Sequence, residues 1–167
     1  MTIRWTSLAF SLLIAVGAAG CGPSSGQVKT ARQASYKTDA NTAFKAVVDV
    51  VAKKYKVINA DTAIGKLRTE DRWYEKDGTY EDRNAAEGRL VEDGSVVMYY
   101  MVGLVGGPDT YQVEVVPFVA QVREGYAAPV KLAPDDIGMP GWVQGKTDDL
   151  YLAIYEALKP YAVAPGS

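Results

Sequence analysis

Two amphipathic segments, one on each side of a run of strand-like sequence, set the tightest limit on how this chain can fold. In residues 39–55 apolar side chains recur at spacings of three and four, which places them on one face of a helix. Asp39 stands at the expected N-cap. Residues 147–161 repeat the spacing, with Thr147 as the expected cap and Asp148 near the positive end of the helix dipole. Each helix therefore needs an apolar surface to cover it.

The residues between these helices have the pattern of antiparallel strands separated by turns. Strands are expected over 55–60, 65–75, 96–105 and 110–123, with a short one near 89–92. Alternation in the second strand predicts that Leu67, Thr69 and Trp73 share one face. Residues 96–105 are apolar in both phases, which indicates a strand covered on both faces or central in its sheet. Pro117 predicts a bulge or an edge position in the last strand.

The expected fold class is α+β. It is a two-layer sandwich in which an antiparallel meander of four or five strands carries an N-terminal and a C-terminal helix on one face. A single domain is expected over 39–162, followed by a loose tail at 163–167. Residues 42–69 resemble BamC-like helix-grip domains of outer-membrane assembly lipoproteins, through a helix, a hairpin and a G-x-L-x-T pattern at 65–69. The resemblance implies this architecture rather than a role.

The first 20 residues have the parts of an export signal. Arg4 precedes an apolar core at residues 5–16, and small residues follow at 17–20. The core is too short and too interrupted by hydroxyl residues to span a bilayer comfortably, since a spanning helix takes about 20 residues. Residues 22–38 are rich in Gly, Pro, Ser, Lys and Arg, so 21–38 is expected to be a flexible tether that carries the anchor.

The sequence Ala18-Ala19-Gly20-Cys21 resembles the lipobox of bacterial lipoproteins, although leucine usually stands where Ala18 is. The resemblance implies cleavage between Gly20 and Cys21, a diacylglycerol on the Cys21 sulfur, and attachment to the cell envelope. Gly22, rather than aspartate, implies sorting to the outer membrane, facing the periplasm. Two alternatives stay open: ordinary signal cleavage with a free thiol, and an uncleaved anchor. Cys21 is the only cysteine, so an intramolecular disulfide is excluded.

Composition narrows the classes of function. The chain has 18 basic and 20 acidic side chains, and removal of residues 1–20 takes away only Arg4. This acidic balance argues against a nucleic-acid partner, which requires a basic face. The chain has no histidine, the commonest general base and metal ligand. We therefore expect no enzyme, no cofactor and no metal.

Two acidic features have ordinary structural explanations. Asp61-Thr62-Ala63 is similar to the D-T-G of aspartic proteases, but alanine replaces the glycine and a turn explains the segment. Residues 70–93 hold nine acidic and four basic side chains. They do not fit a calcium-loop frame, because Trp73 would take the first ligand position, and a solvated hairpin is expected.

Residues 125–145 form a long Pro- and Gly-rich connection that carries three large apolar residues, Ile137, Met139 and Trp142. Loops of this length are often functional, so these residues are a candidate partner-binding loop, but we favour the interpretation in which Trp142 pins the loop to the core. The expected function is that of a membrane-anchored envelope lipoprotein, a non-catalytic accessory or scaffold subunit that binds another envelope protein. The alternative is a carrier of lipid or of a small apolar ligand held between helices and sheet.

Overall fold

The computed structural model describes residues 23–82 and 91–163. The helices are α1 (Ser25–Gln33), α2 (Ala40–Lys54) and α3 (Gly141–Leu158), and a 3-10 turn, η1, covers Lys159–Tyr161. The strands are β1 (Ser35–Lys37), β2 (Val57–Asp61), β3 (Lys66–Thr69), β4 (Arg72–Tyr74), β5 (Tyr80–Glu81), β6 (Val96–Gly106), β7 (Thr110–Gln121), β8 (Val130–Lys131) and β9 (Ala162–Val163).

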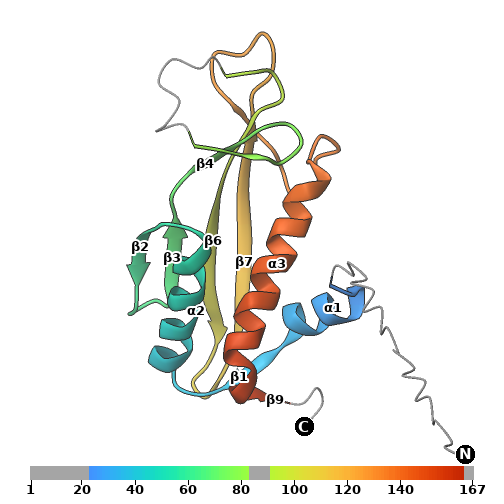
Figure 1. Ribbon diagram of the computed structural model, residues 1–167. Coiled ribbons are helices and arrows are strands. Elements are labelled where there is room, and N and C mark those ends of the chain that lie inside the picture. Colours follow the sequence, from blue (N-terminus) through green and yellow to red (C-terminus); the bar gives the residue numbers. More distant parts are fainter. Residues whose placement is uncertain (1–22, 83–90, 164–167) are drawn as a thin grey trace, which may run out of the picture.

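The long hairpin of β6 and β7 is the spine of one antiparallel sheet (Figure 1). Its register runs without interruption from Val96 opposite Gln121 to Gly106 opposite Tyr111. The main strand order is β2-β3-β6-β7-β1-β9. Strands β3 and β4 pair with successive parts of β6, β5 pairs with β4, and β1 and β8 pair with opposite ends of β7.

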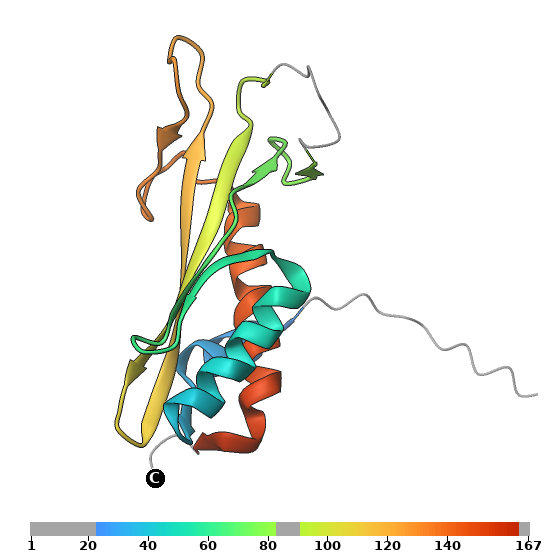
Figure 2. The same cartoon turned by 90° about the vertical axis from the view of Figure 1, so that its left-hand side faces the viewer.

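Helices α1, α2 and α3 lie on the same side of this sheet, and no helix of residues 23–82 and 91–163 lies on the other side (Figure 2). Alternate residues of β6 (Val96, Met98, Tyr100 and Val102) point toward the helices and are at most 2% exposed. They pack against apolar residues of α2 and α3 in one core. The predicted α+β fold with helices on one face is therefore confirmed. The sheet has nine strands in the described residues rather than four or five, because strands of two or three residues leave no alternating pattern.

Helix α2 forms where the apolar spacing predicts it. The Asp39 carboxylate caps the helix by accepting a hydrogen bond from the Thr42 backbone N–H at 2.9 Å. Phe44, Val47 and Val51 are buried on one face. Burial of this face outweighs the low helix propensity of the valines.

Residues 25–37 are not the flexible tether that the sequence predicts. Helix α1 begins with a reciprocal cap between Ser24 and Gln27, and it packs against α3. Strand β1 pairs with β7 and β9, and Tyr36 is 1% exposed. Only isolated residues, such as Ala31 and Tyr36, are buried here, so the stretch has no apolar periodicity to reveal it. At the other end, Val163 belongs to β9, and the rest of the predicted loose tail, 164–167, lies outside the described residues.

Helix α3 begins six residues before the predicted cap. Pro140 is the N-cap, whereas Thr147 is buried inside the helix and its hydroxyl donates to the Val143 carbonyl at 2.8 Å. Gly141 and Gly145 conceal this first part of the helix, because glycine is normally a poor helix former.

The sheet also tests two sequence predictions, one about the shared face of Leu67 and Trp73 and one about Pro117. Leu67 lies opposite Val102 on the helix side, but Trp73 lies opposite Val97 on the other side, so the prediction of one shared face is wrong. The cause is a break between β3 and β4 that changes the phase of alternation. Pro117 occupies the part of β7 between its pairings with β1 and β8, which confirms an edge position. Nearby, the Val115 N–H donates to the Tyr151 hydroxyl at 2.9 Å.

Candidate interaction surfaces

The connection between β8 and α3 presents one fully exposed apolar side chain. Ile137 has a relative exposure of 105%, and Tyr126, in the turn before β8, is 66% exposed. The backbone around Ile137 is held in place: the Asp136 carboxylate accepts from the Gly138 N–H at 2.7 Å, and the Met139 N–H donates to the Asp136 carbonyl at 2.9 Å. Ile137 is therefore displayed on an ordered turn.

The other two residues of the predicted loop face the core instead. Trp142 lies in the first turn of α3, where its indole N–H donates to the Lys76 carbonyl at 3.1 Å. Its ring lies 5.1 Å from that of Tyr74, whose pKa is raised to about 12 by burial. Met139 also packs against the core. Trp142 thus ties the end of the connection to the β4–β5 hairpin, and of the three predicted residues only Ile137 is fully exposed.

The face of the sheet opposite the helices carries a second surface, which the sequence reasoning missed. We call it the open face: the outward residues of β6 and β7 together with their neighbours on β3, β4 and β8. Its half-buried apolar residues on the spine are Val97, Tyr99, Met101, Val116, Phe118 and Ala120. The signal was present, because residues 96–105 are apolar in both phases, but this pattern does not say what covers the second face.

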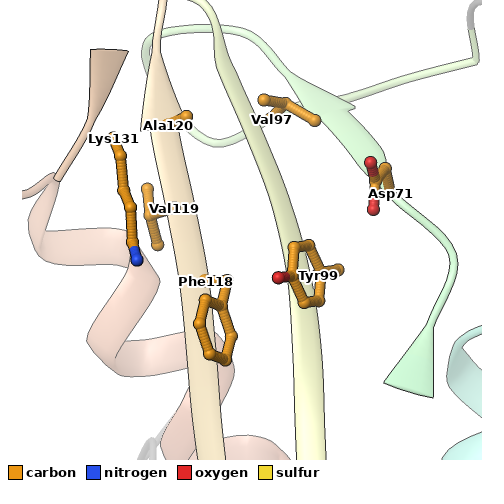
Figure 3. A pocket seen from close by; sticks show the side chains of 7 residues that line it. All are labelled: Asp71, Val97, Tyr99, Phe118, Val119, Ala120 and Lys131. Atoms are coloured by element: carbon orange, nitrogen blue, oxygen red, sulfur yellow. The ribbon is translucent and has the colours of Figure 1, made fainter. Parts of the chain in front are cut away.

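Four side chains form a stack across the open face (Figure 3 shows the central two rings and Lys131). The rings of Tyr99 and Phe118 are parallel within 1°, with centroids 4.9 Å apart. The Arg68 guanidinium lies 4.1 Å from the Tyr99 centroid, and the Lys131 ammonium lies 5.4 Å from the Phe118 centroid. Because a cation or a ring covers each ring on both sides, the stack is not a free platform on which a sugar or base could stack.

Shallow depressions lie on both sides of this stack. One, of about 320 Å³, is bordered by Asp71, Tyr99, Phe118 and Lys131 (Figure 3). The other, of about 210 Å³, contains Gly103 between the charged residues Lys66 and Glu114. Asp71 pairs with Arg68 at 2.7 Å, whereas no ion pair involves Lys66 or Glu114 within residues 23–82 and 91–163.

A groove of about 310 Å³ runs between α3 and the unpaired edge of β7. Its apolar wall includes Val115, Pro117, Leu132, Met139 and Val143. Arg32 of α1 also lines the groove, and its guanidinium is held by the Asp148 carboxylate at 2.7 Å.

The remaining sequence candidates are placed as follows. Asp61 accepts hydrogen bonds from the backbone N–H groups of Ala63 and Ile64, so it stabilises the turn after β2 as expected. No group of acidic or cysteine side chains in the described residues is arranged to hold a metal ion. Gly20 and Cys21 lie outside the described residues. Within those residues, every helix is too short or too polar to cross a membrane.

Comparison with known proteins assigns no family to the chain. No protein-family model matches, and no curated protein matches. Among solved structures, the chain is similar to the uncharacterized conserved protein YugN from Geobacillus kaustophilus HTA426, with 10% identity and a TM-score of 0.32. The alignment covers 75% of this chain and 96% of that protein. A similarity at this TM-score carries no argument about function.

Proposed function

We propose that this protein is a membrane-anchored bacterial envelope lipoprotein, a non-catalytic accessory subunit that binds another envelope protein. The lipobox-like sequence ending at Cys21 supports the anchor. In this proposal the Cys21 sulfur carries the lipid and the domain faces the periplasm from the outer membrane. Confinement at the membrane raises the effective concentration of a membrane partner, so a modest contact surface is enough for binding.

The observation that carries the binding role is the exposure of Ile137. An isoleucine that is wholly in solvent contributes nothing to the packing of its own domain, yet its turn is fixed by the hydrogen bonds of Asp136. Fully burying such a side chain in a partner stabilises the complex by about 1.5–3 kcal/mol. That range corresponds to an affinity gain of roughly ten- to a hundred-fold. A fixed turn also loses little entropy on binding.

The contact is tested by photo-cross-linking in intact cells. A photoreactive residue is placed at position 137 and, as the matched control, at position 64, because Ile64 is 61% exposed on the turn between β2 and β3. A discrete adduct with an envelope protein is expected from position 137 and not from position 64. Equal labelling from both positions, or no adduct from 137, would contradict the role of this turn.

The Ile137→Ser variant supplies a second measurement. We expect it to lower co-purification of the partner identified by the adduct by about tenfold or more, since the serine buries no comparable apolar area. Ile64→Ser should leave the yield unchanged. Because both side chains are exposed, neither substitution should alter the unfolding midpoint.

The groove between α3 and β7 favours a second candidate function, that of a carrier for a small apolar ligand or lipid chain. Its volume of about 310 Å³ is at the lower end of ligand sites, and its walls are largely apolar. Native mass spectrometry of the freshly purified protein tests this function. A bound lipid that is lost from a Val143→Trp variant would support the carrier, and a ligand-free wild-type spectrum would count against it.

A further inference from the structure

We propose that the open face is the contact surface of a symmetric dimer of this chain. This inference goes beyond the proposed function, because the open face and the Ile137 turn are different surfaces. Contiguous apolar residues that remain uncovered on a sheet are typical of interaction sites. Here they lie in the middle of the sheet, on its two longest strands, so the partner must approach the face rather than an edge.

The open face has charges of both signs in a self-complementary arrangement. Near the stack, Asp71 lies on the β4 side and Lys131 on the β8 side. Four residues farther along β6, Lys66 lies on the β3 side and Glu114 on the β7 side. Asp71 is already paired with Arg68, so the opposite signs that no other side chain in the described residues neutralises are those of Lys131 near the stack and Glu114 at the other level, both on the β7–β8 side. A surface of a single sign would suit nucleic acid or an anionic membrane, but this alternation suits a copy of itself.

The two copies can be related by a two-fold axis at the level of Met101 and Val116. This axis lies between the two facing sheets, parallel to both sheets and perpendicular to their strands. It places the Tyr99–Phe118 level of one copy over the Gly103–Glu114 level of the other, because both levels are two residues from the axis. Lys131 then faces the partner copy's glutamate at position 114, and the Arg68–Asp71 ion pair faces its lysine at position 66. An isologous dimer makes each of these contacts twice.

The shape of the open face agrees with the same axis. The stack of Tyr99 and Phe118 lies between the two depressions, and Gly103 contributes no side chain to the one that the stack would enter. At the axis, Met101 and Val116 would meet their own copies in an apolar centre, with Arg68 at its margin opposite Met101. Two sheets that pack in this way lie about 10 Å apart, as in β-sandwiches.

A cysteine placed at the axis tests the dimer directly in the full-length protein in isolated membranes. Facing Cα atoms of sheets about 10 Å apart are too far apart for a direct disulfide, so a bis-maleimide that spans about this distance is used as the cross-linker. Val116→Cys should form a cross-linked dimer of twice the chain mass. Gly145→Cys, an exposed position on α3, should not. A cross-link from Val116→Cys to another protein, or a monomer at both positions, would overturn the proposal.

Variants with reversed charges provide a second test of the dimer. Glu114→Lys and Lys131→Glu should each reduce the Val116→Cys dimer about tenfold or more. The combination of both exchanges should restore it. Lys54→Glu, on the exposed side of α2, is the matched control and should have no effect. Failure of the double exchange to restore the dimer would refute the proposed axis.

The state of Cys21 is measured in the same samples by acyl labelling. An unlabelled Cys21 would refute the lipid anchor but not the dimer, because cross-linking can then be repeated in a Cys21→Ala background. A labelled Cys21 with no dimer would refute only the dimer.

Discussion

Tyr100 provides the sharpest test of the core, because its buried hydroxyl makes no hydrogen bond of normal geometry. The residue is 0% exposed, and in the described residues its Oη has no partner within hydrogen-bonding distance and angle, although the side chains of Tyr55 and Thr147 are close enough to affect its pKa. The ring packs edge-on to Tyr55 at 5.1 Å, and the backbone N–H donates to Thr69 Oγ1 at 2.9 Å. Neither contact needs the hydroxyl. Burial also raises the pKa of Tyr100, so the group is neutral at ordinary pH.

Tyr100→Phe should therefore stabilise the protein. An unpaired buried polar group costs about 1–3 kcal/mol, and loss of one oxygen leaves only a small void that offsets part of the gain. We expect a net increase of about 1 kcal/mol in the free energy of unfolding, or about 2–5 °C in Tm. Urea unfolding followed by circular dichroism measures it, with an unchanged m-value.

Tyr80→Phe is the matched control, because Tyr80 is 50% exposed and its hydroxyl can be hydrated. It should change stability by less than about 0.5 kcal/mol. If Tyr100→Phe instead destabilises the protein by about 1 kcal/mol, the hydroxyl has a partner and this account of the core is wrong.

Three further predictions follow from the same structure. Gly78→Ala should cost about 1–3 kcal/mol more than Gly125→Ala in urea unfolding: both glycines have positive φ, but only the Gly78 Cβ would lie 2.7 Å from the Trp142 ring. Burial raises the pKa of Tyr36, Tyr74 and Tyr100 above the ordinary 10.0. The contribution of these neutral side chains to the free energy of unfolding is therefore complete below pH 10 and is lost as the pH rises above 10. In an alkaline titration, the absorbance of ionised tyrosine should therefore rise in the same transition in which the protein unfolds. A gradual rise in absorbance without unfolding would contradict this prediction. The Thr42 hydrogen bond lowers the pKa of Asp39, so the cap contributes stability above about pH 4 and loses it at lower pH. Asp39→Ala should flatten that part of the pH–stability profile, and an unchanged profile would contradict the cap.

The parts of the fold that sequence reasoning predicted are those with local signals. Helix α2 has both a periodic apolar face and a side-chain cap. Helix α1 has a local cap formed by Ser24 and Gln27, but neither α1 nor β1 has a periodic apolar face. The other contacts that hold them come from far away in the sequence: Arg32 pairs with Asp148, and Tyr36 lies opposite Tyr111. No local pattern contains those contacts.

The candidate surfaces were predicted only in part, for a related reason. Composition singled out Ile137, Met139 and Trp142 together, but tertiary packing separates them, since Trp142 is held by Tyr74 and the Lys76 carbonyl. The open face required the register of β6 and β7, which brings Tyr99 beside Phe118 across 19 positions of sequence. Apolar alternation shows that a face is apolar, and only the arrangement of helices shows that none in the described part of the chain covers it.

The state of the Cys21 sulfur in cells tests the central claim most directly. Intact mass spectrometry and acyl labelling of the protein from membranes should show a chain that begins at Cys21 and carries lipid. The Cys21→Ala variant should lose the label and leave the membrane fraction. A wild-type protein that is recovered in soluble form, with an unmodified thiol, would contradict the account.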